Sequence, residues 1–568
     1  MRVMPAASWR AAASLFGRNR LFAVALVPAV LLRIDAELGY RWQSWFNDSF
    51  NYVTSAVTLT LDPTRPSGYA VYLRVLEPFH SFALVTISQH LMGLLVAVMI
   101  YALARHRFGV PAWVAVLFSL PVLYDGFEIQ LEHLIMADTL FLFLAMAAVT
   151  LVLWSPRPSW RACLLAGFLL GLSAVVRSTG LPLLAVFAVY LFIRFLPGVF
   201  GTARRRWRGL VAALAACGVA FAVPVVAYEG WYDLQHGEFT MTDSTGVFLY
   251  SRVMTFADCS RMQLPADLLS LCTTVPPAQR PIAQAYIWTP ASPLDRFPAP
   301  KFSPLPNKLA EQFAIKAIEA QPADYARVVF DDTWRSFAWN RAVFPNGATY
   351  NEYLFGYHSL DVPGGHRFGG YGSTAAYYVR GDPLTVVVNP FATAIRLYER
   401  YVWLPGTVYG LILLIGLAGI VLAWLRPGTD KRASVNTGVA ALLPWACSLA
   451  LVVVPAATAE FDYRYVLTAA PFACLAAALA FARSAAGGRW LARHGLAPGE
   501  STVPGENAVP GESTVPGEST VPGESTVPGE SAPAGGAAGL AGGFPGGGLG
   551  GGTADAGHDQ RDFAPDAS

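Results

Sequence analysis

Residues 83–104 read ALVTISQHLMGLLVAVMIYALA and are followed directly by Arg105 and Arg107. This run holds no Asp, Glu, Lys or Arg, and it is longer than the roughly 20 apolar residues that cross a bilayer as a helix. Similar runs recur along the chain, so the pattern predicts an all-α polytopic membrane protein with about ten transmembrane helices. The expected spans are 21–36, 83–104, 111–124, 133–154, 161–176, 180–197, 209–228, 402–425, 436–456 and 465–482.

The composition of the whole chain agrees with these runs. Of the 568 residues, 54% are hydrophobic and only 14% are charged, whereas about a quarter of the residues of a soluble domain are charged. This excludes a soluble cytosolic enzyme, and the long apolar runs exclude a membrane β-barrel. The net charge of +2 gives no basis for nucleic-acid binding.

The basic residues indicate how the chain is oriented. Lys and Arg concentrate in cytoplasmic loops, and here every second loop is basic. We therefore expect a multi-pass protein of the plasma membrane with both termini in the cytoplasm. The basic residues that indicate this are Arg2, Arg10, Arg18, Arg20, Arg105, Arg107, Arg157, Arg161, Arg204, Arg205, Arg206, Arg208, Arg426, Lys431, Arg432, Arg483, Arg489 and Arg493.

This orientation divides the chain into four parts. The polar insertion is long enough to fold as its own small domain, and it has helix-like stretches near 309–319 and 323–337. The tail repeats Val-Pro-Gly-Glu-Ser-Thr and has too little apolar surface to fold, so we expect it to be disordered. The parts are 1–228, a transmembrane module with an outer loop at 37–82; 229–401, the extracytoplasmic domain; 402–483, the last transmembrane helices; and 484–568, the cytoplasmic tail.

Two of the six cysteines belong to the outward insertion. Cys259 and Cys272 lie thirteen positions apart, and an oxidising exterior would let them form a disulfide. Two free thiols are the alternative. The other four cysteines lie in apolar spans, where they are small buried hydrophobes.

Ionisable and aromatic residues gather where the expected spans meet the exterior. A carboxylate there can act as a general base towards a hydroxyl, and arginines can hold a phosphate through paired hydrogen bonds while negative charge develops on it. The pattern therefore favours a reaction in which a hydroxyl loses a proton and a phosphate leaves. The residues are Asp48, Tyr52, Arg65, Tyr69, Asp125, Glu128, Glu132, His133, Asp138, Arg177, Glu460, Asp462, Arg464 and Tyr465.

The order of these motifs resembles the GT-C superfamily of integral-membrane glycosyltransferases, particularly the protein mannosyltransferase and aminoarabinose transferase branch. Residues 48–52, Asp-Ser-Phe-Asn-Tyr, are similar to the Asp-Glu-x-x-Tyr element of that branch, with Ser49 in place of the second acid. Residues 65–69 are similar to its Pro-x-Gly-Tyr element, and Glu132-His133 with Asp138 to its acidic second loop. Gln89-His90 and Arg464-Tyr465, followed by Pro471, add weaker resemblance.

The resemblance implies transfer of a sugar, with inversion, from a polyprenyl-phosphate donor to a hydroxyl of a protein, lipid or glycan outside the membrane. Asp48 would take the proton from the acceptor, and Arg177 and Arg464 would bind the phosphate. Glu132 and His133 would position a substrate or ligate a metal. The remaining substrate-binding candidates are Tyr52, Arg65, Asp138 and Tyr465. No cofactor is specified: a divalent metal is not required by the sequence, and Ser49 weighs against one.

Each assignment has a simpler alternative. Asp48 could cap a helix, with Asp35 and Glu37 as rival bases. Glu132 and His133 could be a structural pair, because there is no ligand spacing such as His-Glu-x-x-His. The arginines, Arg65 above all, could reach to lipid headgroups.

Two other functions compete with the transferase. A transporter or lipid flippase would show internal repeats and helices broken at mid-bilayer, and neither is visible in the sequence. A non-catalytic envelope scaffold would leave the outer carboxylates and arginines unexplained.

Overall fold

The computed structural model describes residues 19–195, 203–290, 292–357, 371–425 and 431–482, which belong to one compact unit, Met1–Pro498. The predicted repeat tail lies outside the described residues.

The described residues form an almost wholly helical fold, as the composition predicts. The helices are α2 (Arg20–Gly39), α3 (Asn47–Thr58), α4 (Gly68–Leu76), α5 (Phe82–Ala102), α6 (Ala112–Leu117), α7 (Leu120–Tyr124), α8 (Gly126–His133), α9 (Asp138–Trp154), α10 (Trp160–Val176), α11 (Leu181–Phe195), α12 (Ala203–His236), α13 (Thr245–Met254), α14 (Ala283–Trp288), α15 (Pro304–Ala320), α16 (Pro322–Arg335), α17 (Gly347–Glu352), α18 (Tyr371–Val379), α19 (Phe391–Tyr401), α20 (Gly406–Leu425), α21 (Lys431–Thr458) and α22 (Tyr463–Ala480).

Membrane-spanning helices dominate this unit. Within the described residues, six helical segments are long and apolar enough to cross a bilayer, and α9 and α10 are shorter apolar helices. The chain is therefore a multi-pass membrane protein. The six segments are Phe82–Arg107, Ser178–Phe195, Trp207–His236, Gly406–Leu425, Val435–Thr458 and Tyr463–Ala480.

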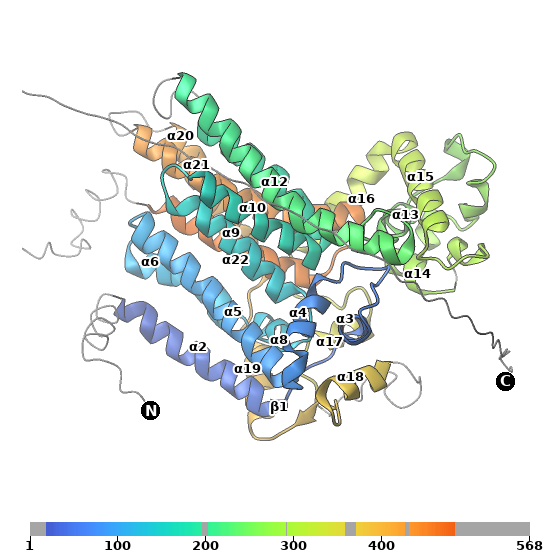
Figure 1. The fold of residues 1–568 in the computed structure, drawn as a ribbon, viewed down its shortest axis with the longest axis horizontal. Coiled ribbons are helices and arrows are strands. Elements are labelled where there is room, and N and C mark those ends of the chain that lie inside the picture. The colour runs from blue at the N-terminus through green and yellow to red at the C-terminus, as the bar shows by residue number, and fades with distance from the viewer. Residues whose placement is uncertain (1–18, 196–202, 291, 358–370, 426–430, 483–568) are drawn as a thin grey trace, which may run out of the picture. The chain divides into compact units, whose positions relative to one another are not determined.

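The apolar helices pack side by side, as Figure 1 shows for α9, α10 and α12 and for the group α20, α21 and α22. The largest buried apolar cluster joins side chains from all of these helices, with Phe141, Leu170 and Phe472 among its fully buried members. Because α22 contacts α5, α7, α8 and α9 as well as α20 and α21, the last helix brings the C-terminal spans against the N-terminal ones.

Two expected spans have other boundaries in the structure. Residues 111–124 form two short helices, α6 and α7, instead of one. The span expected from 133 begins at Asp138, because the preceding residues pair with the outer loop instead: Ser44 donates its backbone N–H to the His133 carbonyl at 3.1 Å, and Ile135 donates to the Ser44 carbonyl at 3.1 Å.

The insertion expected as a separate domain has its own apolar core. Side chains from α13, α14 and α15, among them Val247, Tyr250 and Phe313, form a second buried cluster. Figure 1 shows these three helices lying together. Helix α15 contains the first stretch predicted to be helical, and α16 contains the second except for its last two residues, because α16 ends at Arg335. A disulfide joins Cys259 to Cys272, whose Cα atoms are 6.2 Å apart.

The loop expected at 37–82 is held at both of its ends. At its start, the short strands β1 (Tyr40–Arg41) and β2 (Val386–Val387) pair antiparallel. Further along, α4 begins at Gly68, where a side chain would collide with the backbone carbonyl of Val175 near the end of α10. This close approach brings the loop residue Arg65 and the end of α10, where Arg177 lies, to the same part of the molecule.

Candidate functional site

The N-terminus of α3 carries the expected base. The backbone N–H of Phe46 donates to the Ser49 hydroxyl at 2.9 Å, so the serine that replaces the second acid of the resembled motif caps this helix. Asn47 donates its backbone N–H and its side-chain amide to Glu352, at 3.1 and 2.6 Å. Asp48 therefore sits in the first turn, where the helix dipole stabilises a negative charge.

The carboxylate of Asp48 lies between two guanidinium groups. Arg65 contacts Oδ1 at 2.5 Å, and Arg464 contacts Oδ2 at 3.0 Å. Burial of Asp48 raises its pKa, but the charges of Arg65 and Arg464 outweigh this and lower the pKa to about 2. The carboxylate is thus ionised at neutral pH, and its side chain remains 15% exposed.

Arg464 is fixed from a second direction. Its Nε lies 3.0 Å from Oδ2 of Asp462, and that carboxylate also accepts a 2.8 Å hydrogen bond from the Tyr353 hydroxyl. The guanidinium lies over the Phe46 ring at 5.4 Å and the Tyr465 ring at 5.6 Å. Aromatic faces and two carboxylates thus hold this cation at the N-terminus of α22.

Arg177 is the third cation of this site. It forms an ion pair with Asp138 at the start of α9, and its guanidinium also lies over the Tyr465 ring, 5.4 Å from the ring centroid. Burial and the neighbouring charge of Arg464 lower the pKa of Arg177, and its field lowers that of Asp48. Three guanidinium groups therefore act on the carboxylate of Asp48, and each of them is partly exposed.

We name the residues that meet here the rim cluster. It contains seven of the predicted site residues, although they come from five different parts of the chain. Tyr52 joins through Arg65, which lies 5.9 Å from its ring centroid. The rim cluster comprises Asp48, Tyr52, Arg65, Asp138, Arg177, Arg464 and Tyr465.

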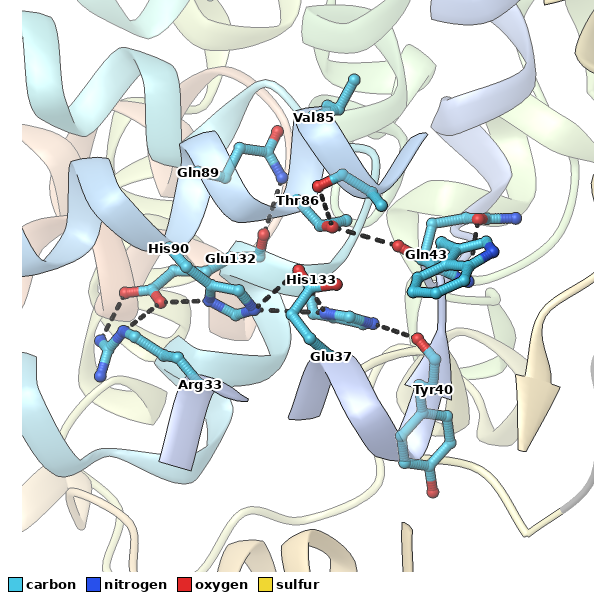
Figure 2. Close-up of polar contacts among 12 residues, drawn as sticks. Arg33, Glu37, Tyr40, Gln43, Val85, Thr86, Gln89, His90, Glu132 and His133 are labelled. Carbon is cyan, nitrogen blue, oxygen red and sulfur yellow. Dashed lines mark hydrogen bonds and ion pairs between the residues drawn. The ribbon is translucent and has the colours of Figure 1, made fainter. Parts of the chain in front are cut away.

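Glu132 and His133 belong to a different group, drawn in Figure 2. Arg33 reaches both oxygens of Glu132 from α2, each at 2.7 Å. His90 contacts the same carboxylate through Nδ1 at 2.8 Å, and its Nε2 faces Nδ1 of His133. We name Arg33, Glu37, His90, Glu132 and His133 the buried cluster.

Sequence reasoning did not assign several residues of these clusters. Arg33 and Glu37 lie one helical turn apart inside an apolar segment. Charged side chains are costly in such a segment, so their presence indicates that they are functional or paired. Glu37 was weighed only as a rival base, and His90 only as part of a weak motif. No signal in the sequence links Glu352 to α3, because the contact joins residues 305 positions apart.

Within the buried cluster, Glu37, His90 and His133 could hold a metal ion, since one ligand atom from each lies within 4.8 Å of the others. The rim cluster instead offers cations, which suit an anionic ligand such as a phosphate.

No protein-family model matches the chain, and no curated protein matches it either. Several solved structures do. The S. cerevisiae protein O-mannosyltransferase Pmt1-Pmt2 complex bound to the sugar donor is 17% identical over 42% of this chain and 36% of that chain, with a TM-score of 0.33. Archaeoglobus fulgidus oligosaccharyltransferase AglB, in complex with an inhibitory peptide and a dolichol-phosphate, is 14% identical over 87% and 53%, with a TM-score of 0.40.

ArnT from Cupriavidus metallidurans, bound to undecaprenyl phosphate, is 15% identical over 77% of this chain and 78% of that chain, with a TM-score of 0.29. The chain thus spans about a third to a half of the mannosyltransferase and oligosaccharyltransferase chains that it matches. Because the TM-scores are below 0.5, we infer the function from the residues of the site.

Proposed function

We propose that this protein is a lipid-linked glycosyltransferase. It would transfer a sugar from a polyprenyl-phosphate donor to an acceptor hydroxyl on the extracytoplasmic side. The observation that carries this proposal is the rim cluster, where the carboxylate of Asp48 bridges Arg65 and Arg464 and a third guanidinium, that of Arg177, lies close by. A general base beside convergent phosphate-binding cations is what such a transfer requires.

In the proposed reaction, the acceptor oxygen attacks the anomeric carbon from the face opposite the phosphate. The new carbon–oxygen bond forms as the bond to the phosphate oxygen breaks, which inverts the anomeric centre. The hydroxyl proton passes to Asp48, and the lipid phosphate leaves with the bonding electrons. Arg177 and Arg464 stabilise the charge that grows on the leaving phosphate.

The low pKa of Asp48 also fits this sequence of events. A carboxylate with a pKa of about 2 is a weak base while both arginines face it. A bound phosphate would share the guanidinium groups of Arg65 and Arg464, which weakens their pull on Asp48 and raises its pKa. The base would thus become stronger only when the donor is in place.

The donor's apolar tail needs a place beside this site. A small groove of about 170 Å³ lies between α3, α4 and α12, lined by Leu59, Ala70, Val71 and Trp231 among others. Its wall includes Ser67, which follows Arg65 in the same loop. We assign the first isoprene units of the donor to this groove.

The test is transfer by purified full-length protein in nanodiscs, supplied with polyprenyl-phosphate sugars and envelope acceptors. Asp48→Asn should lower the rate by about 10²- to 10⁴-fold, the range for loss of a general base, without changing the elution volume of the protein. Asp324→Asn is the matched control, since Asp324 is an exposed carboxylate paired with Arg261. Full activity in Asp48→Asn would refute the assignment, and lipid movement without sugar transfer would favour a flippase.

A further inference from the structure

Three ligand atoms converge inside the buried cluster. Nε2 of His90 and Nδ1 of His133 are 3.2 Å apart, and Oε1 of Glu37 is 3.7 Å from each of them. A point equidistant from the three atoms lies about 2.1 Å from each, which is the length of zinc–nitrogen and zinc–oxygen bonds. Figure 2 shows both rings and the carboxylate directed towards this point.

The hydrogen-bond partners fix which ring nitrogens carry hydrogen. Nε2 of His133 lies 2.8 Å from the Tyr40 carbonyl, which can only accept, so this nitrogen is protonated. Nδ1 of His90 lies 2.8 Å from Glu132, a carboxylate already paired with Arg33, and donates to it. In neutral rings, each of the two nitrogens that face each other therefore carries a lone pair and no hydrogen.

A cation held between these three atoms would satisfy all of them at once. Two lone pairs at 3.2 Å repel each other, and the adjacent carboxylate of Glu37 adds a negative charge. Neither oxygen of Glu37 accepts a hydrogen bond of normal geometry, although both are buried. Arg33 does not supply the missing charge, because its guanidinium is matched by Glu132.

The surroundings of the two histidines are those of metal ligands. A ligating imidazole typically donates its other N–H to a carboxylate or a backbone carbonyl, which sets its tautomer and orientation. His90 has the carboxylate of Glu132 in this position, and His133 has the carbonyl of Tyr40. Both histidines are at most 5% exposed, so the site is shielded from bulk water.

We infer that Glu37, His90 and His133 form a structural binding site for a divalent metal ion of the zinc class. The site joins the end of α2, the middle of α5 and the end of α8. It also lies at the base of the first outer loop, because His133 accepts from the backbone of Ser44, a few residues before Asp48. The metal would hold the start of this loop in place and would take no part in the transfer of a sugar.

The experiment uses full-length protein purified without a polyhistidine tag. After exposure to Zn²⁺ and removal of free metal, elemental analysis should find about one equivalent per chain, since a preformed site of buried ligands binds tightly. Replacement by Co²⁺ should give the visible absorption of a cobalt ion bound by nitrogen and oxygen ligands. This second measurement requires no variant.

The matched variants separate ligation from folding. Glu37→Gln and His133→Ala should lower the metal affinity at least about tenfold, the smallest loss expected even for a ligand's supporting partner. His236→Ala should leave it unchanged, because His236 bonds the Leu61 carbonyl and stacks on Tyr232 outside the cluster. A wild-type protein that is monodisperse and takes up neither Zn²⁺ nor Co²⁺ would overturn the inference, as would variants that keep full affinity. Neither result depends on glycosyl transfer.

Discussion

The rim cluster and the buried cluster use the same chemical groups in different surroundings. Both pair carboxylates with guanidinium groups at distances between about 2.5 and 3.0 Å. The side chains of Asp48, Arg65 and Arg464 are 14–16% exposed, whereas Arg33 and Glu132 are at most 3% exposed. An anionic ligand can therefore compete for the arginines of the rim cluster, whereas Arg33 is closed off from such a ligand.

The comparison assigns ligand binding to the rim cluster and a contribution to folding to the buried cluster. Charges at the rim are balanced by partners that a phosphate could replace, so changes there should alter catalysis more than folding. In the buried cluster the carboxylate of Glu132 is balanced by Arg33 inside the protein, so changes to this pair should alter folding first. The predictions that follow test this separation, from the largest expected effect to the smallest.

The first prediction concerns the buried ion pair. Arg33→Met leaves the carboxylate of Glu132 without its partner, so we expect the stability to fall by about 3–5 kcal/mol. Thermal unfolding in detergent, followed by the remaining monodisperse fraction, measures this. Arg261→Met is the control: its pair with Asp324 is about half exposed and should contribute less than about 1 kcal/mol. Equal losses in the two variants would contradict the comparison.

The second prediction concerns the rim. Arg464 contacts Asp48 through one nitrogen and Asp462 through another, and lysine offers only one point of charge. Arg464→Lys should therefore raise KM for the lipid-phosphate donor by about 10- to 100-fold, the loss of one charged hydrogen bond, while the protein stays folded. Steady-state transfer kinetics measure this, with exposed Arg327→Lys as the control. An unchanged KM would remove Arg464 from the donor site.

The third prediction tests the packing of the buried cluster. At Gly93 in α5, a Cβ atom would collide with Oε1 of Glu132, so Gly93→Ala should lower the stability by about 1–3 kcal/mol. Gly218→Ala is a matched control inside α12, because nothing lies within 4 Å of the added carbon. Thermal unfolding of the two variants should differ clearly. If both behave alike, the glycine does not make room for the carboxylate.

The fourth prediction concerns pH. Burial raises the pKa of Glu352 from 4.5 to about 7, and the charge of Asp48 adds to this. The folded protein then holds this proton more tightly than the unfolded chain, so its stability should decline as pH rises from 4.5 through about 7. In Glu352→Gln this decline should be smaller. Thermal unfolding across that pH range measures it, and identical slopes in the two proteins would refute the assignment.

Part of the site could be predicted from the sequence because the signal was local. Asp48 and Tyr52 are recognisable from their spacing, and Arg177 and Arg464 from positive charge on the side where it is rare. The pairing of these residues was not predictable, because Asp48 and Arg464 are 416 positions apart. The resemblance implied that Glu132 and His133 position a substrate or ligate a metal, and only the structure shows their contacts with Arg33 and His90.

By itself, the sequence determined that the chain is a helical, multi-pass membrane protein, because apolar runs of bilayer length have no other stable structure in lipid. It also determined which polar residues lie near the ends of those runs. Only the tertiary structure decided how they divide into two clusters. That division depends on helices α2, α5, α8 and α22 meeting at particular faces, and such packing is set by side-chain shape and close backbone contact, not by hydropathy.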